Sequence, residues 1–220
     1  MTVVCVGKVE RAKSMRESNL KGKRIYAFGD SIVYGHTLPK KSFMRIIAEE
    51  TGAELTMCAV NGSTVIRGDN HILTQVGNAP AEKPDMIIFD GYTNDAYERN
   101  KNLWGEITDA EPDDTTFCGG FEKIVQTMQQ KWSGVPLFFV TIHKSGGREW
   151  DIQCTLRALA MEICEKYGVQ VIDVFEHADL DTRDSVQMEK YIIGGAGSHP
   201  NEEACREFYV PLVLGALENR

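Results

Sequence analysis

The sequence lacks the marks of several protein classes. Among its 220 residues there is no apolar run near the ~20 residues that a membrane helix requires. The net charge of -8 argues against a nucleic-acid partner, because such partners need clustered lysine and arginine. The amino terminus has too short an apolar stretch, with no positive charge before it, for a secretory signal. We therefore expect a cytoplasmic protein with no membrane span and no nucleic-acid partner.

Signatures of disulfides and metal sites are also missing. No cysteine belongs to a C-x-x-C pair, and none has a neighbouring histidine at metal-ligand spacing. The six cysteines are Cys5, Cys58, Cys118, Cys154, Cys164 and Cys205. We expect free thiols and no metal ion. A chain of this length buries roughly 70% of its unfolded surface on folding, so it needs no covalent staple.

Short apolar runs alternate with helical patterns along most of the chain. The runs cover residues 25–28, 55–60, 86–89, 135–142 and 169–174. Continuous apolar runs of this length are typical of strands that are covered on both faces. Amphipathic helices are predicted up to residue 52, from 117 to 128, from 152 to 167 and after Pro200. The pattern predicts a three-layer α/β/α sandwich around a five-stranded, mainly parallel sheet.

The first residues differ from the rest of the chain. Residues 1–22 hold one short apolar run and then a polar, charged segment, and the regular alternation begins at residue 23. We therefore expect an amino-terminal extension, 1–22, followed by a single domain, 23–220. Within the domain, residues 96–114 are polar and acidic without periodicity, and such long loops are often functional.

Three of the predicted strands end in polar breaks. Ser31, Gly62 and Asn94 each follow a strand closely. In a parallel sheet the carboxyl ends of the strands meet at one edge, where ligands bind. His199 precedes Pro200, which favours the first turn of a helix and places the histidine on the loop before it. We expect these polar residues to form one site.

The three polar breaks and the loop of His199 carry sequence motifs that resemble those of a known family. Ser31 lies in Phe-Gly-Asp-Ser-Ile, Gly62 in Ala-Val-Asn-Gly-Ser-Thr, Asn94 in Gly-Tyr-Thr-Asn-Asp and His199 in Gly-Ser-His-Pro-Asn. In this order they resemble the four blocks of the GDSL or SGNH hydrolases. The resemblance covers roughly residues 23–218 and implies a flavodoxin-like SGNH fold and a serine esterase or acylhydrolase without a metal or organic cofactor.

The resemblance implies a role for each of these residues. Ser31 would be the nucleophile and His199 the base that accepts its proton, since a serine hydroxyl is a weak nucleophile alone. The amides of Ser31 and Gly62 and the side chain of Asn94 would form the oxyanion hole. The implied substrate is a small acyl ester, an acylated carbohydrate or a lysophospholipid.

The chain departs from the family pattern behind the histidine. Family members usually carry an aspartate three residues before the histidine, and here that position is Ala196. In one interpretation a backbone carbonyl near Ala196 orients His199, and the protein works with a Ser-His dyad. In another, a different carboxylate takes the place of the aspartate, and the candidates are Asp181, Asp184 and Glu189. The alternative is a catalytically impaired protein with the same fold that binds a ligand.

Two further side chains are candidates for the substrate pocket. His36 shares the loop of Ser31, and Trp104 lies in the long polar segment and can reach the same edge. Binding of a phosphate or nucleotide at this edge is a weaker alternative, because no glycine-rich phosphate loop follows the first strand and no lysine lies among the polar breaks.

Overall fold

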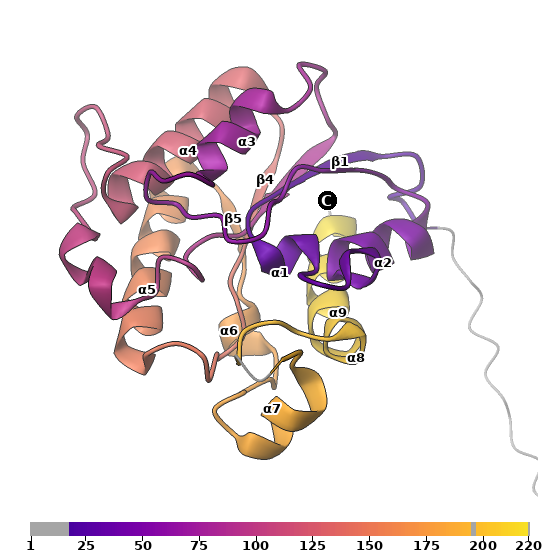
Figure 1. Ribbon diagram of the computed structural model, residues 1–220. Helices are drawn as coiled ribbons and strands as arrows, with labels where there is room; N and C mark the ends of the chain where they lie inside the picture. The colour runs from indigo at the N-terminus through magenta and orange to yellow at the C-terminus, as the bar shows by residue number, and fades with distance from the viewer. Residues whose placement is uncertain (1–17, 195–196, 220) are drawn as a thin grey trace, which may run out of the picture.

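The computed structural model describes residues 18–194 and 197–219. A five-stranded sheet forms its centre, with every neighbouring pair parallel, in the order β2-β1-β3-β4-β5 (Figure 1). The strands are β1 (Arg24–Phe28), β2 (Glu54–Met57), β3 (Met86–Phe89), β4 (Leu137–Val140) and β5 (Gln170–Ile172). Each lies within a predicted apolar run or begins one residue before it. The predicted α/β/α class is confirmed, and the sheet is wholly parallel.

Helices cover both faces of the sheet. Figure 1 shows α3, α4 and α5 on one side and α2 and α9 on the other. The α-helices are α1 (Ser31–Tyr34), α2 (Phe43–Thr51), α3 (Ile72–Asn78), α4 (Phe117–Lys131), α5 (Trp150–Tyr167), α6 (Val174–His177), α7 (Ser185–Tyr191), α8 (Glu202–Ala204) and α9 (Val210–Glu218). Two 3-10 segments, Pro39–Lys41 and Glu98–Leu103, and a π-helical turn, Cys205–Tyr209, complete the fold.

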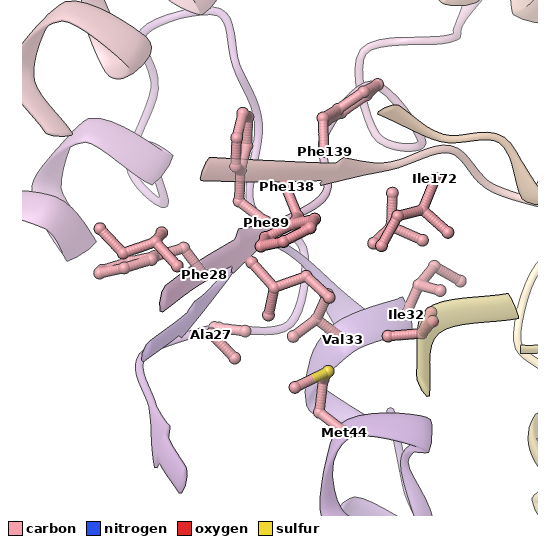
Figure 2. Close-up of a cluster of buried hydrophobic side chains, with 14 of the residues drawn as sticks. Ala27, Phe28, Ile32, Val33, Met44, Phe89, Phe138, Phe139 and Ile172 are labelled. Carbon is pink, nitrogen blue, oxygen red and sulfur yellow. The ribbon is translucent and has the colours of Figure 1, made fainter. Parts of the chain in front are cut away.

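The core explains why the strands are apolar throughout. All residues of β3 and β4 are buried, since each strand packs against helices on both faces. Figure 2 shows Phe138 and Phe139 of β4 on opposite sides of the strand, and the ring centroids of Phe89 and Phe139 lie 5.3 Å apart. The sheet is therefore a rigid base for the loops at its carboxyl edge.

Apolar periodicity predicts the long helices, and local signals set their ends. The Thr116 hydroxyl accepts a hydrogen bond from the amide of Gly119 and caps α4. Helix α5 ends at Gly168, whose φ of 66° is left-handed. The carboxyl-terminal helix is divided into α8, the π-helical turn and α9.

Four helices have no counterpart in the sequence prediction: α1, α3, α6 and α7. Helix α7 buries only Tyr191, and α1 and α6 span four residues each. Helices with so few buried positions give no apolar stripe that could be recognised.

The described part of the predicted extension packs against the end of the chain. The side chain of Leu20 is buried, the Ser18 hydroxyl donates to Glu218 Oε1 at 2.5 Å, and the Asn19 side chain donates to the Glu218 carbonyl at 2.8 Å. Residues 1–17 lie outside the described residues. Among the described helices, none is long and apolar enough to cross a membrane.

Candidate active site

Ser31 is placed by the sharp turn between β1 and α1. Gly29 has a φ of 128°, and a Cβ there would lie 1.7 Å from Asp90 Oδ1, so no side chain fits. Asp30 then caps α1 by accepting a hydrogen bond from the amide of Ile32 at 2.8 Å. Ser31 is therefore the first residue of the helix, with its side chain at the carboxyl edge of the sheet.

The Ser31 hydroxyl meets the imidazole of His199. Oγ and Nε2 lie 3.0 Å apart, although the residues are 168 positions apart in the sequence. This is hydrogen-bond distance. When Nε2 accepts this hydrogen bond, the neutral ring carries its proton on Nδ1. The geometry is suited to transfer of the serine proton to the ring.

The loop that carries His199 is held by a buried network at Gly197. The Gly197 carbonyl accepts hydrogen bonds from Thr182 Oγ1 at 2.7 Å and Ser145 Oγ at 2.9 Å, and His143 Nε2 lies 3.3 Å away. Burial lowers the pKa of His143 to about 4, so this ring is neutral and donates to the carbonyl. The network fixes the backbone two residues before His199.

A second histidine covers the ring of His199. The imidazole of His36 stacks on it with a centroid distance of 3.8 Å and an interplanar angle of 6°. His36 has a φ of 48°, which is rare for a residue other than glycine. Burial first, and then the positive charges of His36 and Arg148, lower the pKa of His199 from 6.5 to about 4. His199 is thus a neutral base over a wide pH range.

The carboxylates proposed from the sequence to orient His199 are engaged elsewhere. Asp181 forms an ion pair with Arg183, with Oδ1 2.8 Å from Nε. Asp184 caps α7 through the amides at its start, and Glu189 is exposed on that helix. Among the described residues, none of the three forms a hydrogen bond with His199. The structure does not bring them to the base.

Ala196, the position of the missing aspartate, lies outside the described residues. Within residues 18–194 and 197–219, the only side-chain hydrogen bond of His199 is the one to Ser31. The observed supports of the base are therefore the stacked ring of His36 and the network at Gly197.

The three predicted oxyanion donors come from neighbouring loops. Asn94 Nδ2 donates to the Ser63 carbonyl at 2.9 Å and to Asp30 Oδ2 at 3.3 Å. These acceptors are the chain neighbours of Gly62 and Ser31, so Asn94 joins the two loops that carry the predicted amide donors. Within the part of the chain that the structure describes, the amides of Ser31 and Gly62 donate to no protein group. Both are free to bind a substrate oxygen.

Two buried side chains hold these loops in register. Asp95 accepts hydrogen bonds from the amides of Val65 and Ile66, both at 3.0 Å, and burial raises its pKa to about 7. Gln75 bonds both the amide and the carbonyl of Gly29, at 2.9 and 2.8 Å, and donates to Ser63 Oγ at 2.8 Å. The sequence gives no signal for Gln75, because its partners are distant in the chain.

A buried pair of acids lies beneath the nucleophile. The Asp30 amide donates to Asp90 Oδ1 at 2.8 Å, and both side chains are buried. Burial raises the pKa of each, and the charge of Asp30 raises that of Asp90 further, to well above its ordinary value. Two buried carboxyl groups in contact cannot both ionise readily, so we expect the pair to retain a proton.

Arg148 was not predicted and lies close to the candidate site. Its Nε donates to the Thr93 carbonyl at 2.5 Å, and its Nη1 donates to the Gly147 carbonyl at 2.6 Å. Arg148 belongs to the loop that follows β4, and this strand, like β1 and β3, ends at the carboxyl edge of the sheet. Its place after a predicted strand is the one sequence signal that could have identified Arg148.

The remaining predicted pocket residue, Trp104, is not brought to the site. Its side chain packs on the hydrophobic core, and no contact with Ser31 or His199 is found among the described residues. The same residues contain no cluster of histidine, cysteine, aspartate and glutamate that could hold a metal ion. Of the cysteines, those described are free thiols, and Cys5 lies outside the described residues.

Comparison with known proteins identifies the family. Residues 27–206 match the GDSL-like lipase/acylhydrolase family. The structure resembles a protein from Lactobacillus plantarum with a TM-score of 0.77 at 23% identity, over 91% of this chain and 98% of that one. It resembles a member of the lipolytic protein G-D-S-L family from Veillonella parvula with a TM-score of 0.61 at 18% identity, over 87% and 96%.

At these identities the structural likeness shows the fold alone, and no curated protein matches the sequence. The family match, by contrast, covers most of the chain. The chain therefore belongs to the GDSL-like lipase/acylhydrolase family and is a hydrolase that acts on ester bonds.

Proposed function

We propose that the protein hydrolyses small acyl esters through an acyl-enzyme formed on Ser31, with His199 as the base. The observation that carries this proposal is the 3.0 Å separation of Ser31 Oγ and His199 Nε2. A serine without such a partner is a poor nucleophile at neutral pH.

In the first half of the reaction, Ser31 attacks the acyl carbon. As Oγ bonds to that carbon, His199 Nε2 takes the hydroxyl proton and the carbonyl electrons move onto the substrate oxygen. The amides of Ser31 and Gly62 stabilise the resulting oxyanion, together with Asn94 Nδ2 once its longer hydrogen bond, 3.3 Å to Asp30 Oδ2, is exchanged for one to the substrate oxygen. When the carbon–oxygen bond to the alcohol breaks, His199 gives its proton to the departing oxygen.

In the second half, water replaces the alcohol. His199 takes a proton from water as the water oxygen bonds to the acyl carbon, and the same donors bind the second oxyanion. Collapse of this intermediate breaks the bond to Ser31 Oγ, which recovers its proton from His199. The products are the acid, the alcohol and the free enzyme.

The base works in this proposal without a carboxylate. A triad aspartate fixes the tautomer and plane of the imidazole. Here the stacked ring of His36 supports the plane of the His199 ring, and the network at Gly197 supports its backbone. The low pKa of His199, about 4, keeps the ring neutral at pH 7, so that Nε2 can accept the serine proton, but it also makes the ring a weaker base than free histidine.

Exposed apolar side chains on the loops near Ser31 are available to contact an acyl chain. Leu38 and Val60 are exposed large apolar residues, at 43% and 45%, and they lie close in sequence to His36 and Gly62. The two loops are linked, since the Asn61 side chain donates to the His36 carbonyl at 3.5 Å. Together they offer a small apolar surface beside the nucleophile.

Hydrolysis of p-nitrophenyl acetate, butyrate and octanoate tests the proposal. We expect turnover that favours the short esters and is lost after treatment with a fluorophosphonate, which reacts with activated serines. A protein that binds esters but neither hydrolyses them nor reacts with the phosphonate would instead be the ligand-binding alternative.

The stacked histidine leads to a prediction about pH. Since the base acts when neutral, we expect kcat/KM to fall only as the pH drops toward the His199 pKa of about 4. His36→Phe keeps a stacked ring but removes a positive charge that disfavours protonation of His199. The acid limb of the pH–rate profile should therefore move to higher pH, while remaining below 6.5 because burial, the larger cause, persists.

The matched control is His177→Phe, which changes an exposed histidine at the end of α6. Its acid limb should coincide with that of the wild type. An acid limb near pH 6.5 in the wild type, or one that His36→Phe leaves in place, would contradict this electrostatic role of His36.

A further inference from the structure

Arg148 lies between the two loops that carry Asn94 and His199. On one side, its loop abuts the His199 loop, because a Cβ on Gly197 would lie 2.3 Å from the amide nitrogen of Gly147. On the other side, its Nε donates to the carbonyl of Thr93, the residue before Asn94. The loop of Arg148 therefore connects the loop of the base with the loop of an oxyanion donor.

No described carboxylate pairs directly with this guanidinium, although the buried Asp30 attracts it through space. Two of its nitrogens donate to backbone carbonyls, but among the described residues no carboxylate forms an ion pair with it, and its Nη2 donates no hydrogen bond. The Cζ atoms of Arg148 and the exposed Arg99 each lie 4.3 Å from the centre of the Tyr97 ring, and Arg99 likewise has no described ion pair. Two unpaired cations thus share one aromatic ring, in a protein whose net charge is -8.

A cavity of about 470 Å³ opens beside these groups, between residues 96–98 and 146–149. Two carboxylates also line it. Glu98 is paired with Lys101 at 2.7 Å, and Glu149 is exposed. Arg148 is partly buried, where a charge-assisted hydrogen bond is stronger than at the surface. The cavity therefore presents one cation, Arg148, on the loop that packs against the His199 loop.

We propose that Arg148, assisted by Arg99, binds a carboxylate or phosphate group carried on the alcohol portion of the ester substrate. This inference rests on the proposed function. In that mechanism His199 must reach the oxygen of the departing alcohol, and Arg148 belongs to the loop packed against the His199 loop. A guanidinium matches the paired oxygens of either anion.

Three acetyl esters of small alcohols test the proposal by their rates of acetate release. Acetoxyacetate carries a carboxylate, 2-acetoxyethyl phosphate carries a phosphate and 2-hydroxyethyl acetate is neutral. All three form the same acyl-enzyme, so differences arise in the acylation step that kcat/KM reports. For Arg148→Gln we expect the ratio of kcat/KM for an anionic ester to that for the neutral ester to fall by about 10- to 100-fold.

Arg148→Lys, which keeps the charge but not the planar fork, should lower this ratio less. Arg99→Gln should lower it by roughly 3-fold, because the side chain is exposed. The site prefers the anion, carboxylate or phosphate, whose ester shows the larger fall in the kcat/KM ratio for Arg148→Gln. Arg183→Gln is the matched control, since Arg183 also stacks on an aromatic ring, that of Trp150 at 3.7 Å, but is paired with Asp181. Its ratio should equal that of the wild type.

The proposal is overturned if Arg148→Gln changes the ratio no more than Arg183→Gln does, while hydrolysis of all three esters depends on Ser31. If Ser31→Ala hydrolyses the neutral ester as fast as the wild type, the proposed function itself is wrong. Inhibition of the wild-type enzyme by the product alcohols provides a test that needs no variant. Glycolate and 2-hydroxyethyl phosphate should inhibit competitively and more strongly than ethylene glycol, and equal inhibition by all three would also overturn the proposal.

Discussion

Replacing Ser31 with alanine is expected to lower kcat for p-nitrophenyl acetate by about 10⁶-fold, as loss of the nucleophile does in a serine hydrolase. The substitution removes the only protein atom that bonds to the acyl carbon in the proposed mechanism. It should leave the fold intact, because the Ser31 hydroxyl has the His199 ring as its hydrogen-bond partner and supports no other described element. Activity should be measured on protein whose circular dichroism matches that of the wild type.

The control is Ser185→Ala. Ser185 is exposed at the start of α7 and takes no part in the proposed reaction, so this variant should turn over at the wild-type rate. If Ser31→Ala retained more than a tenth of the wild-type kcat, the hydrolysis would proceed without an acyl-enzyme on this serine.

Replacing Asn94 with alanine has the second largest expected effect on turnover. We expect kcat to fall by roughly 10²- to 10³-fold, because the transition state loses the Asn94 N–H that exchanges its bond to Asp30 for one to the oxyanion. KM should change much less, since the donor matters most when negative charge has developed on the substrate oxygen. Part of the loss will reflect the hydrogen bonds from Asn94 to Ser63 and Asp30, which join the two amide-bearing loops.

Steady-state kinetics of Asn94→Ala beside Asn78→Ala separates the oxyanion role from a general loss of structure. Asn78 is an exposed asparagine at the end of α3, so its removal should leave kcat at the wild-type value. A rise in KM with unchanged kcat for Asn94→Ala would show that Asn94 binds the ground state and transition state equally, and would remove it from the oxyanion hole.

The fold was predictable because its strands are covered on both faces. Runs such as Met86–Phe89 and Leu137–Val140 are wholly buried and therefore read as continuous apolar segments. Helix α5 was predictable because it has a buried stripe and a glycine at its end. Helices α1 and α7 were not, because their few buried positions show no period and their first turns depend on caps from Asp30 and Asp184.

The candidate site was partly predictable for a similar reason. Ser31, Gly62 and Asn94 each follow a strand, so their convergence at one edge follows from a parallel sheet. The contact between Ser31 and His199 requires in addition that the loop of His199 return to this edge. The resemblance of the histidine motif to that of the family implied this return. Arg148 carries no local motif, since its place depends on contacts with distant loops.

The orientation of the base could not be predicted from the sequence. The carboxylates suggested by proximity in the chain are held by other partners, Asp181 by Arg183 and Asp184 by the start of α7. The stack of His36 on His199 depends on a left-handed backbone conformation at His36. Left-handed backbone is uncommon at residues other than glycine, so the sequence alone does not indicate that His36 adopts it.

Labelling with a fluorophosphonate tests most directly whether Ser31 is a nucleophile activated by His199. In this reaction Oγ bonds to phosphorus, fluoride leaves and His199 takes the serine proton, so labelling requires both residues but no natural substrate. Peptide mapping by mass spectrometry should place the phosphonyl group on Ser31 in the wild type, and His199→Ala should label far more slowly. A label on another residue, or a labelling rate that His199→Ala leaves unchanged, would contradict the account.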